Sequence, residues 1–338
     1  QTTFSYDANK NLTSVTCPGT NCTITMAYDS NHRMTSITDA ENNTTTFTYY
    51  TSGGNSGKLW KITNAASKVV AEYTYDTANH NTTVKDARNN TVTLEYNENR
   101  NVKKFTDASS KYASTTWDTD VKPTAYTDRK NKSYSFTYDS SNRKTQDKDP
   151  LNNTTNYTYY NSGGGQNRVY TVTDARGNTW TYTYDSYGNV TQIKDPYNYT
   201  KNYTYNSHGK VLTFTNERGK TWTYTYDTKG NKLTETCPLN KTITYTYNSM
   251  NLMASMTDRE NSTWTYTYDS AGRLTEEKDP YNKSTTYTYD KNGNRTSVTD
   301  PGGHTTYYDY NSLGQLWKIR YPDSTYEQFW YDDAGNKT

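Results

Sequence analysis

The side chains with the most reactive chemistry in this 338-residue chain are three cysteines and four histidines. Cys17 and Cys22 flank a Pro-Gly-Thr-Asn sequence, so we predict a disulfide between them across the base of a hairpin, worth about 2 kcal/mol of loop-closure entropy. The alternative is that both are small turn residues. Cys237 has no local partner and the histidines are scattered, so we predict no metal site and no cofactor.

Neighbouring carboxylates could support acid–base catalysis, and two such pairs occur, Glu276 with Glu277 and Asp147 with Asp149. In a chain of repeating strands and turns, charges of this kind usually form a solvated face. The sequence offers no combination of nucleophile, base and orienting acid. We therefore predict that the protein is not an enzyme.

These residues lie in a repeating sequence pattern, and the strands and turns that the pattern predicts must position them. An aromatic residue followed by Asp, Asn or Thr recurs 16 times, and we call these aromatic residues the anchors. From Tyr184 to Tyr331 the anchors are 21 residues apart, and the spacing lengthens after Tyr50 and after Tyr160. A fixed period indicates a supersecondary unit that packs on its neighbours. We predict a single array over residues 1–338, with about 15–16 repeats, and expect it to be an uncapped segment of a longer protein.

The first half of a repeat is a strand followed by a turn. Residues Thr179–Tyr184 alternate threonine with Trp or Tyr, which predicts a strand with an aromatic face and a hydroxyl face. In the Asp185-Ser-Tyr-Gly188 sequence that follows, Asp is expected to cap a turn through its side chain, and Gly to adopt a positive φ.

The second half is a weaker strand followed by another turn. Val190 and Ile193 are three residues apart, a spacing that breaks strand alternation and indicates a β-bulge. In the Asp195-Pro-Tyr-Asn198 sequence that closes the unit, Pro presets φ and Asn takes the left-handed position. Each repeat is therefore predicted to be a β-hairpin.

The predicted fold is all-β. Tandem hairpins of about 21 residues form a long antiparallel sheet of about 31 strands. Open twisted sheets rarely exceed about 10 strands before they curl or split, so this sheet is expected to spiral into a hollow shell, barrel or tube.

Aromatic side chains are expected to stabilise the folded chain, because aliphatic residues are too few to form a hydrophobic core. Apolar residues make up only 30% of the chain and the mean hydropathy is −1.19, yet there are 37 tyrosines and seven tryptophans. Anchors recur at one place in every unit, and we expect them to stack as a ladder across the sheet. The ladder residues are Tyr184, Tyr205, Tyr226, Tyr247, Tyr268 and Tyr289.

Asn-x-Ser/Thr sequences are frequent. We expect those at Asn42, Asn81, Asn131, Asn198, Asn240 and Asn282 to lie on exposed turns at one edge of the sheet, where glycosylation could occur. The alternative is that the turn requires Asn and the next strand requires Thr, which places these sequences without any modification.

The repeat has the form Tyr-Asp-x-x-Gly-Asn/Arg-x-Thr-x-x-x-Asp-Pro-x-Gly/Asn-x-Thr-x-Tyr-x, as in residues 268–288. This form resembles the YD repeat, also called the RHS repeat, of Rhs and Tc toxin shells, wall-associated bacterial proteins and teneurins. The resemblance covers nearly the whole chain and implies a spiralling β-sheet around a hollow, largely hydrophilic interior. The core-terminal segment that ends Rhs shells is not found here.

Three functions are consistent with the sequence. We favour a structural, non-catalytic wall of a secreted, extracellular or cell-surface tube, shell or fibre. The alternatives are part of the cocoon of a polymorphic Rhs-type toxin, and a surface adhesin that binds glycans or a receptor. The expected partners are copies of the chain or flanking repeats, an encapsulated cargo, or surface glycans. A net charge of +2 with well-mixed signs, and no apolar run of about 20 residues, indicate neither nucleic-acid binding nor membrane insertion.

Overall fold

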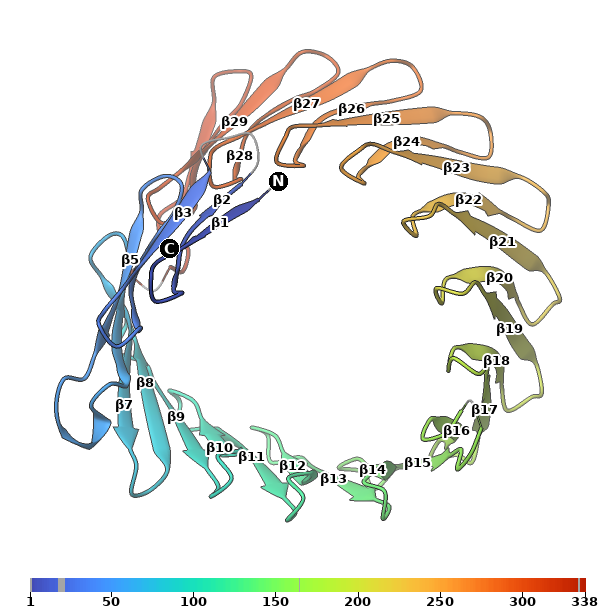
Figure 1. Cartoon of the computed structure of the whole chain (residues 1–338), viewed down its shortest axis with the longest axis horizontal. Coiled ribbons are helices and arrows are strands. Elements are labelled where there is room, and N and C mark those ends of the chain that lie inside the picture. Colours follow the sequence, from blue (N-terminus) through green and yellow to red (C-terminus); the bar gives the residue numbers. More distant parts are fainter. Residues whose placement is uncertain (1, 18–21, 164, 334) are drawn as a thin grey trace. The chain divides into compact units, whose positions relative to one another are not determined.

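The computed structural model describes residues 2–17, 22–163, 165–333 and 335–338. This described part contains 31 β-strands and one short 3-10 turn, η1 (Gly53–Asn55). Two kinds of strand alternate along the chain (Figure 1). The odd-numbered strands, most of which end at an aromatic residue, are β1 (Thr3–Tyr6), β3 (Thr23–Tyr28), β5 (Thr44–Tyr49), β7 (Val69–Asp76), β9 (Thr91–Tyr96), β11 (Tyr112–Trp117), β13 (Ser133–Tyr138), β15 (Thr154–Tyr159), β17 (Thr179–Tyr184), β19 (Thr200–Tyr205), β21 (Thr221–Tyr226), β23 (Thr242–Tyr247), β25 (Thr263–Tyr268), β27 (Ser284–Tyr289), β29 (Thr305–Tyr310) and β31 (Tyr326–Gln328). The even-numbered strands are β2 (Leu12–Thr16), β4 (Met34–Thr38), β6 (Leu59–Thr63), β8 (Asn81–Asp86), β10 (Val102–Thr106), β12 (Pro123–Thr127), β14 (Lys144–Lys148), β16 (Val169–Thr173), β18 (Val190–Lys194), β20 (Val211–Thr215), β22 (Lys232–Thr236), β24 (Met253–Thr257), β26 (Leu274–Lys278), β28 (Arg295–Thr299) and β30 (Leu316–Arg320).

Within each unit the strands form an antiparallel meander, in which strands that follow one another along the chain pair, as in β17–β18 and β18–β19. Within the hairpin β17–β18, Thr183 lies opposite Gln192 but Tyr184 lies opposite Val190, so Thr191 is an extra residue. The same register shift occurs in β21–β22 and β27–β28. The predicted β-bulge is therefore confirmed, as is the predicted all-β antiparallel fold.

The two faces of a strand differ in chemistry, as predicted. In β21 the threonines are exposed while Trp222, Tyr224 and Tyr226 are half-buried. Threonine hydroxyls meet across neighbouring strands, as between Thr225 Oγ1 and Thr234 Oγ1 at 2.6 Å. Aromatic packing on one face and hydroxyl contacts on the other therefore hold adjacent strands together.

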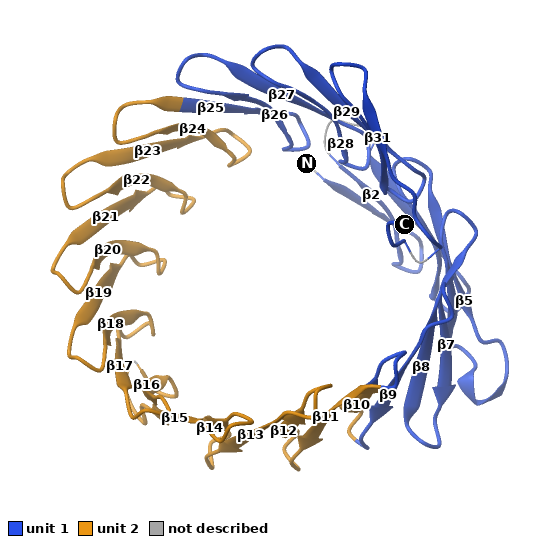
Figure 2. Cartoon of the chain, turned by 180° about the vertical axis from the view of Figure 1, so that it is seen from behind, with its two compact units in different colours: residues 1–98, 106–110, 264–338 blue, residues 99–105, 111–263 orange. Residues whose placement is uncertain are grey.

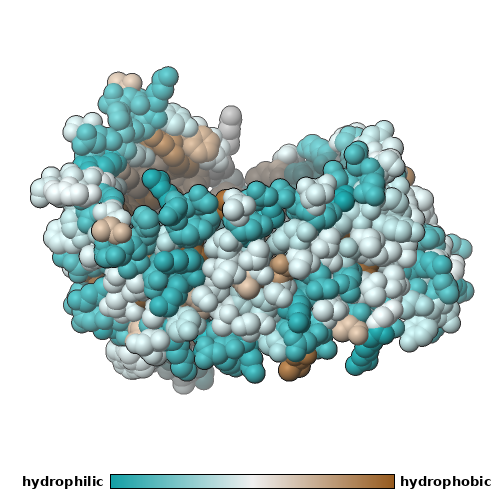
Figure 3. Space-filling model, turned by 90° about the horizontal axis from the view of Figure 1, so that it is seen from below, coloured by the Kyte–Doolittle hydropathy of each residue, from teal (hydrophilic) through white to brown (hydrophobic). Residues whose placement is uncertain are grey.

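The described residues form very little buried core. Only Ala40, Gly165 and Ser297 among them are buried, with 8% of the surface of Ala40 and 7% of that of Ser297 exposed, and none of the described side chains is fully buried. On the face seen in Figure 3, hydrophilic and neutral residues predominate and apolar residues are scattered. None of the described helical segments has the length and hydrophobicity needed to cross a bilayer. Order depends on backbone ladders and half-buried rows of side chains.

Residue contacts divide the chain into two compact units, shown in blue and orange in Figure 2. Unit 1 comprises residues 1–98, 106–110 and 264–338, and unit 2 comprises residues 99–105 and 111–263. The same hairpin builds both units, and the division falls within the repeats. The single array over 1–338 stays a prediction.

Candidate functional site

The recurring feature of the hairpins is a tether from an anchor side chain to the backbone of the preceding repeat. Tyr205 ends β19, and its hydroxyl donates a 2.7 Å hydrogen bond to the carbonyl oxygen of Val190. Val190 is the residue opposite Tyr184 at the bulge of the preceding hairpin. Each anchor thus fastens its neighbour at the bulge, and a hydrogen bond of this kind contributes about 1 kcal/mol.

This tether recurs along the described chain, and the sequence analysis missed it. At one anchor position a tryptophan replaces tyrosine, and Trp117 Nε1 donates to the carbonyl oxygen of Val102 at 3.1 Å. No anchor is Phe, although Phe occurs six times in the chain. This absence could have indicated that the anchor position requires a hydrogen-bond donor. Tyr and Trp both carry a polar hydrogen, which Phe lacks. The same hydroxyl contact is made by Tyr28, Tyr49, Tyr138, Tyr159, Tyr184, Tyr226, Tyr247, Tyr289, Tyr310 and Tyr331.

The two lengthened turns change which tyrosine is the anchor. The sequence pattern selected Tyr50 and Tyr160, which precede Thr and Asn. In the structure Tyr49 ends β5 at a register shift and donates to a carbonyl of the preceding short strand at 2.7 Å. Tyr50 instead donates to a carbonyl of the following long strand at 2.8 Å. Tyr159 and Tyr160 divide the two roles in the same way, so the extra residues lie in the turns and leave the strands in register.

Stacking among the six predicted ladder residues stays a prediction. The aromatic ring contacts of the described residues include Tyr203 with Phe214 and Phe214 with Trp222, whose centroids are 5.2 and 5.5 Å apart. Arginine covers other anchors, as Arg273 does over Tyr289 at 5.0 Å. The geometry that the structure shows for most of the six is the hydroxyl tether.

Carboxylate side chains close the turns, as the sequence predicted. Asp185 Oδ1 accepts the backbone N–H groups of Tyr187 and Asn189, both at 2.9 Å. The hydrogen bond from the Asn189 side chain, followed by these N–H groups, lowers the pKa of Asp185. Gly188 and Asn198 take the left-handed positions of the two turn types, with φ of 84° and 71°. The recurrent Asp residues thus act as turn caps.

Two cysteines replace this capping Asp. The backbone N–H groups of Leu239 and Lys241 lower the pKa of the Cys237 thiol, so this sulfur occupies the place of the carboxylate. Cys17 and Cys22 are free thiols whose Sγ atoms lie 2.6 Å apart. The turn between them, residues 18–21, lies outside the described residues. The disulfide stays a prediction.

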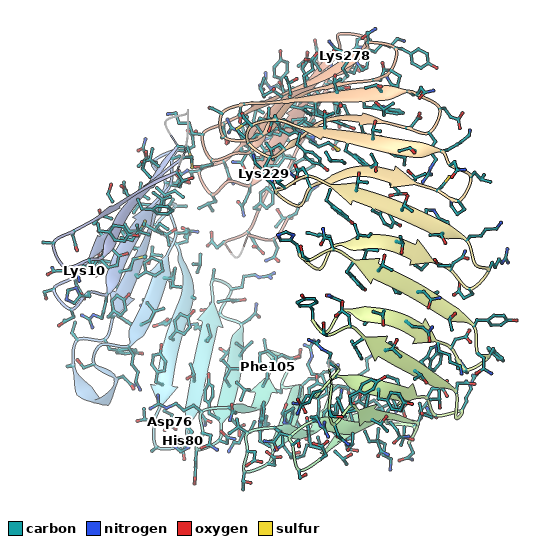
Figure 4. All side chains as sticks on the ribbon, turned by 45° about the vertical axis from the view of Figure 1, so that its right-hand side comes forward. Lys10, Asp76, His80, Phe105, Lys229 and Lys278 are labelled. Carbon is teal, nitrogen blue, oxygen red and sulfur yellow. The ribbon has the colours of Figure 1, made fainter. Side chains whose placement is uncertain are left out.

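Five of the six predicted glycosylation positions lie where expected, and Asn81 does not. The five are exposed and have positive φ in turns that follow even-numbered strands: Asn42, Asn131, Asn198, Asn240 and Asn282. Asn81 is instead the half-buried first residue of β8, directly opposite Asp76. The hairpin β7–β8 keeps its register without a bulge, and Asp76 and His80 lie together at its turn (Figure 4). The expectation of an exposed turn was therefore wrong for Asn81, because it stands at the position where the even-numbered strand begins, as Val190 does in β18.

One carboxylate of each pair binds a residue of the next strand along the chain. Glu276 Oε1 accepts the Ser284 hydroxyl at 2.6 Å, and this bond lowers the pKa of Glu276. Asp147 accepts the Tyr157 hydroxyl at 2.7 Å. Burial, reinforced by this bond, raises the pKa of Tyr157 to about 12. In the parts of the chain that the structure describes, no three His, Cys, Asp or Glu side chains are grouped to hold a metal ion.

Within unit 1, turns from distant parts of the chain meet. The turn between β4 and β5 contacts the turn between β27 and β28, and we call this contact the seam. Asn292 Oδ1 accepts the N–H of Ala40 at 3.1 Å, and Asn292 Nδ2 donates to Asp39 Oδ2 at 2.8 Å. The N–H of Lys291 donates to Glu41 Oε1 at 3.0 Å. Side chains of one turn therefore cap the backbone of the other.

The seam continues along both runs of unit 1. Lys68 Nζ pairs with Asp333 Oδ2 at 3.1 Å. Between the runs lies an open cavity of about 410 Å³, whose lining includes Ile37, Val70 and Leu313. The seam thus combines polar turn contacts with partly covered apolar side chains.

The comparisons with known proteins assign the family. The family model described as Teneurin YD-shell matches residues 64–266 and, overlapping them, residues 196–337. These matches extend over more than half of the chain, so the protein belongs to the teneurin YD-shell family. The family predicted from the repeat sequence is confirmed.

Solved toxin structures share the fold. A TcdB2-TccC3-Cdc42 structure has a TM-score of 0.56 and 15% identity, over 99% of this chain and 20% of that one. The Photorhabdus luminescens Tc holotoxin pore gives 0.55 and 13%, over 94% of this chain and 21% of that one. A TcdB2-TccC3-TEV structure gives 0.54 and 15%, over 98% and 20%. No curated protein matches the chain. The chain thus spans about a fifth of the length of these structures' chains, and the likeness concerns the fold.

Proposed function

We propose that this chain is a stretch of the wall of a hollow β-shell that encloses a polypeptide cargo. The proposal includes a location outside the cell or at its surface. The wall itself catalyses no reaction, and its side chains serve to cap turns and to tether hairpins.

The observation that carries this proposal is a sheet with two accessible faces. Only Ala40, Gly165 and Ser297 of the described residues are buried. Ordinary domains bury each sheet face against a second layer. This sheet has a half-buried aromatic face and an exposed hydroxyl face, and neither face is packed into a hydrophobic core. Such a sheet is suited to form a wall between an interior and an exterior space.

Membership of the YD-shell family and the similar structures support the proposal. Two of those structures are described as TcdB2-TccC3 complexes and one as a Tc holotoxin pore. This chain corresponds to about a fifth of each of those chains and contains the hairpin repeats. We therefore assign it the part of the wall.

The location outside the cell is the finer part of the proposal. The adjacent Cys17 and Cys22 thiols support it, because an oxidising compartment would join them as a disulfide, whereas the cytosol would keep them reduced. Mass spectrometry of the protein from its natural source, with and without reduction, tests this location.

Enclosure is tested by joining an unstructured peptide with trypsin sites to the C-terminus of the full chain. If the wall encloses the peptide, trypsin should cleave it about ten-fold more slowly, or slower still, than the same peptide joined to a compact globular domain. The reason is that trypsin can reach the enclosed peptide only when the wall opens. Equal cleavage rates would contradict enclosure by this chain. Electron cryo-microscopy of the fusion should show a single-sheet wall around a space, and solid lobes would overturn the proposal.

A further inference from the structure

The hairpins of each unit present two kinds of turn at opposite ends of their strands. Anchor turns follow odd-numbered strands, and second turns follow even-numbered strands. In a meander each kind gathers along its own edge of the sheet. At the seam of unit 1, the second turn that contains Glu41 receives the anchor turn that contains Asn292. At this contact a second turn and an anchor turn of unit 1 are therefore complementary to each other.

Second turns of unit 2 carry apolar side chains at the position that Glu41 occupies in the seam. Leu151, Tyr197 and Leu239 stand two residues after the first residue of their turns, as Glu41 does after Asp39. Their side chains are 77%, 78% and 80% exposed. Three second turns of unit 2 therefore have an exposed apolar residue at the position that makes contacts in the seam of unit 1.

The anchor-turn edge of unit 2 has matching features. Tyr187 and Met250 occupy the position that Asn292 and Leu313 hold in their anchor turns. Leu313 lines the seam cavity and is 37% exposed, whereas Tyr187 is 79% exposed. Both edges of unit 2 therefore expose apolar side chains at the positions through which the edges of unit 1 meet, and Tyr281, at the same second-turn position of unit 1, is likewise 83% exposed.

Charged turns alternate with the apolar ones on the second-turn edge. The second turn that follows each apolar one places Arg176, Arg218 and Glu260 at the same position. Such alternation keeps an apolar edge soluble and favours one register of docking over a one-hairpin slip.

We propose that the second-turn edge of unit 2, at Leu151, Tyr197 and Leu239, docks the anchor-turn edge of a second copy of this chain. The occupant follows from the seam, where this chain already joins the same two edges. Hairpins repeat at the same interval on both partners, about 10 Å for two strands, so several turns meet at once. The contact is head-to-tail, because different edges meet, and it allows chains of copies.

Sedimentation velocity of the full chain tests the proposal. The wild type should form dimers and longer species as its concentration rises to about 100 µM, and the triple variant Leu151→Ser/Tyr197→Ser/Leu239→Ser should associate at least about ten-fold more weakly because its apolar contacts are gone. The matched control, Arg176→Ser/Arg218→Ser/Glu260→Ser, changes the same position in the alternate turns and should retain association. A monomeric wild type, or equal loss in both triple variants, would overturn the proposal.

A mixing experiment keeps the test independent of folding defects. The variant Tyr187→Ser/Met250→Ser damages only the anchor-turn edge and should also weaken self-association. Mixed with the Leu151/Tyr197/Leu239 variant, it should form dimers but no longer species. In such a dimer it supplies the intact second-turn edge, and its partner supplies the intact anchor-turn edge. Mixing that restores no dimer overturns the head-to-tail contact, because two folded proteins with complementary intact edges should pair.

Discussion

Units 1 and 2 are built from the same hairpin, but their turns have different surroundings. Ala40 lies in a second turn of unit 1 where a distant turn covers it, and it is 8% exposed. Pro238, at the position equivalent to Ala40 in a second turn of unit 2, is only half-buried. The anchor tethers and capped turns occur in both, as Tyr310 and Tyr226 show. The hairpin therefore does not depend on the seam, which adds stability to hairpins already formed.

Alkaline pH should have the largest effect, because it acts on both units. Burial raises the pKa of Tyr49 and Tyr310 in unit 1 and of Tyr226 and Tyr247 in unit 2, and it raises that of Tyr157 to about 12. An unfolded chain loses its phenol protons near pH 10, whereas the folded chain holds them to higher pH. Stability present below about pH 10 is therefore lost as the pH rises towards about 12.

Urea unfolding followed by circular dichroism measures this loss, and tyrosinate absorbance reports the titration. The midpoint should fall between about pH 10 and pH 12, while it stays level between about pH 7 and pH 9. A midpoint that is unchanged at pH 11 would contradict the assignment of stability to neutral, half-buried tyrosines.

Replacement of one anchor tests whether unit 2 depends on neighbours alone. Tyr226→Ala removes both the tether and the ring, and should cost about 3 kcal/mol, while Tyr226→Phe removes only the hydroxyl bond and should cost about 1 kcal/mol. Hydrogen exchange should speed up in β20–β22 and stay unchanged in β4–β6, since coupling in repeats is between neighbours. Uniform loosening of the entire array would show that the one-dimensional description is wrong.

The two cysteine turns provide a matched pair across the units. Oxidation should join Cys17 to Cys22 in unit 1 and stabilise the protein by about 2 kcal/mol, whereas Cys237 in unit 2 should remain open to alkylation. Mass spectrometry after alkylation, with and without reduction, counts the free thiols. Three thiols alkylated in the natural, unreduced protein would exclude the disulfide, and Cys22→Ser should abolish the stability gain.

The smallest expected effect concerns the seam. Asn292→Ala removes two hydrogen bonds, one to the covered N–H of Ala40 and one to the side chain of Asp39, and should cost about 1 kcal/mol, confined to unit 1. Lys229→Ala, at the equivalent position of an anchor turn in unit 2, should change stability by less than about 0.5 kcal/mol. Hydrogen exchange of the turn between β4 and β5 distinguishes the two variants. Equal protection of this turn in both would mean that the seam contributes nothing.

Much of the local structure could be predicted from the sequence because it is set by neighbours in the chain. Alternation of Thr with Trp and Tyr predicted strands such as β17, and Asp185 and Gly188 predicted a capped turn with a positive φ. The three-residue spacing in β18 predicted its bulge. Each of these follows from strand periodicity and turn chemistry, which act over a few residues.

Other features depended on contacts that spacing did not reveal. The tether of Tyr205 to Val190 links two repeats, and it requires the bulge to direct a carbonyl towards the next anchor. Tyr49 is the anchor because it ends the strand in register, whereas Tyr50 bonds to the following long strand. The sequence pattern had selected Tyr50 because it precedes a threonine, and that choice was wrong. Asn81 was misplaced because it holds the position at which the even-numbered strands begin, as Val190 does in β18, and not a position in a second turn.

The sequence by itself determined the repeat, the hairpin, the family and the chemistry of the two faces, because these depend on residue types a few positions apart. Tertiary structure alone decided which turns meet, as Ala40 and Asn292 do from opposite ends of the chain. The reason is physical: a 21-residue period makes every turn edge nearly alike in sequence. The small curvature and twist at each hairpin, summed over many repeats, then select which edges come into contact.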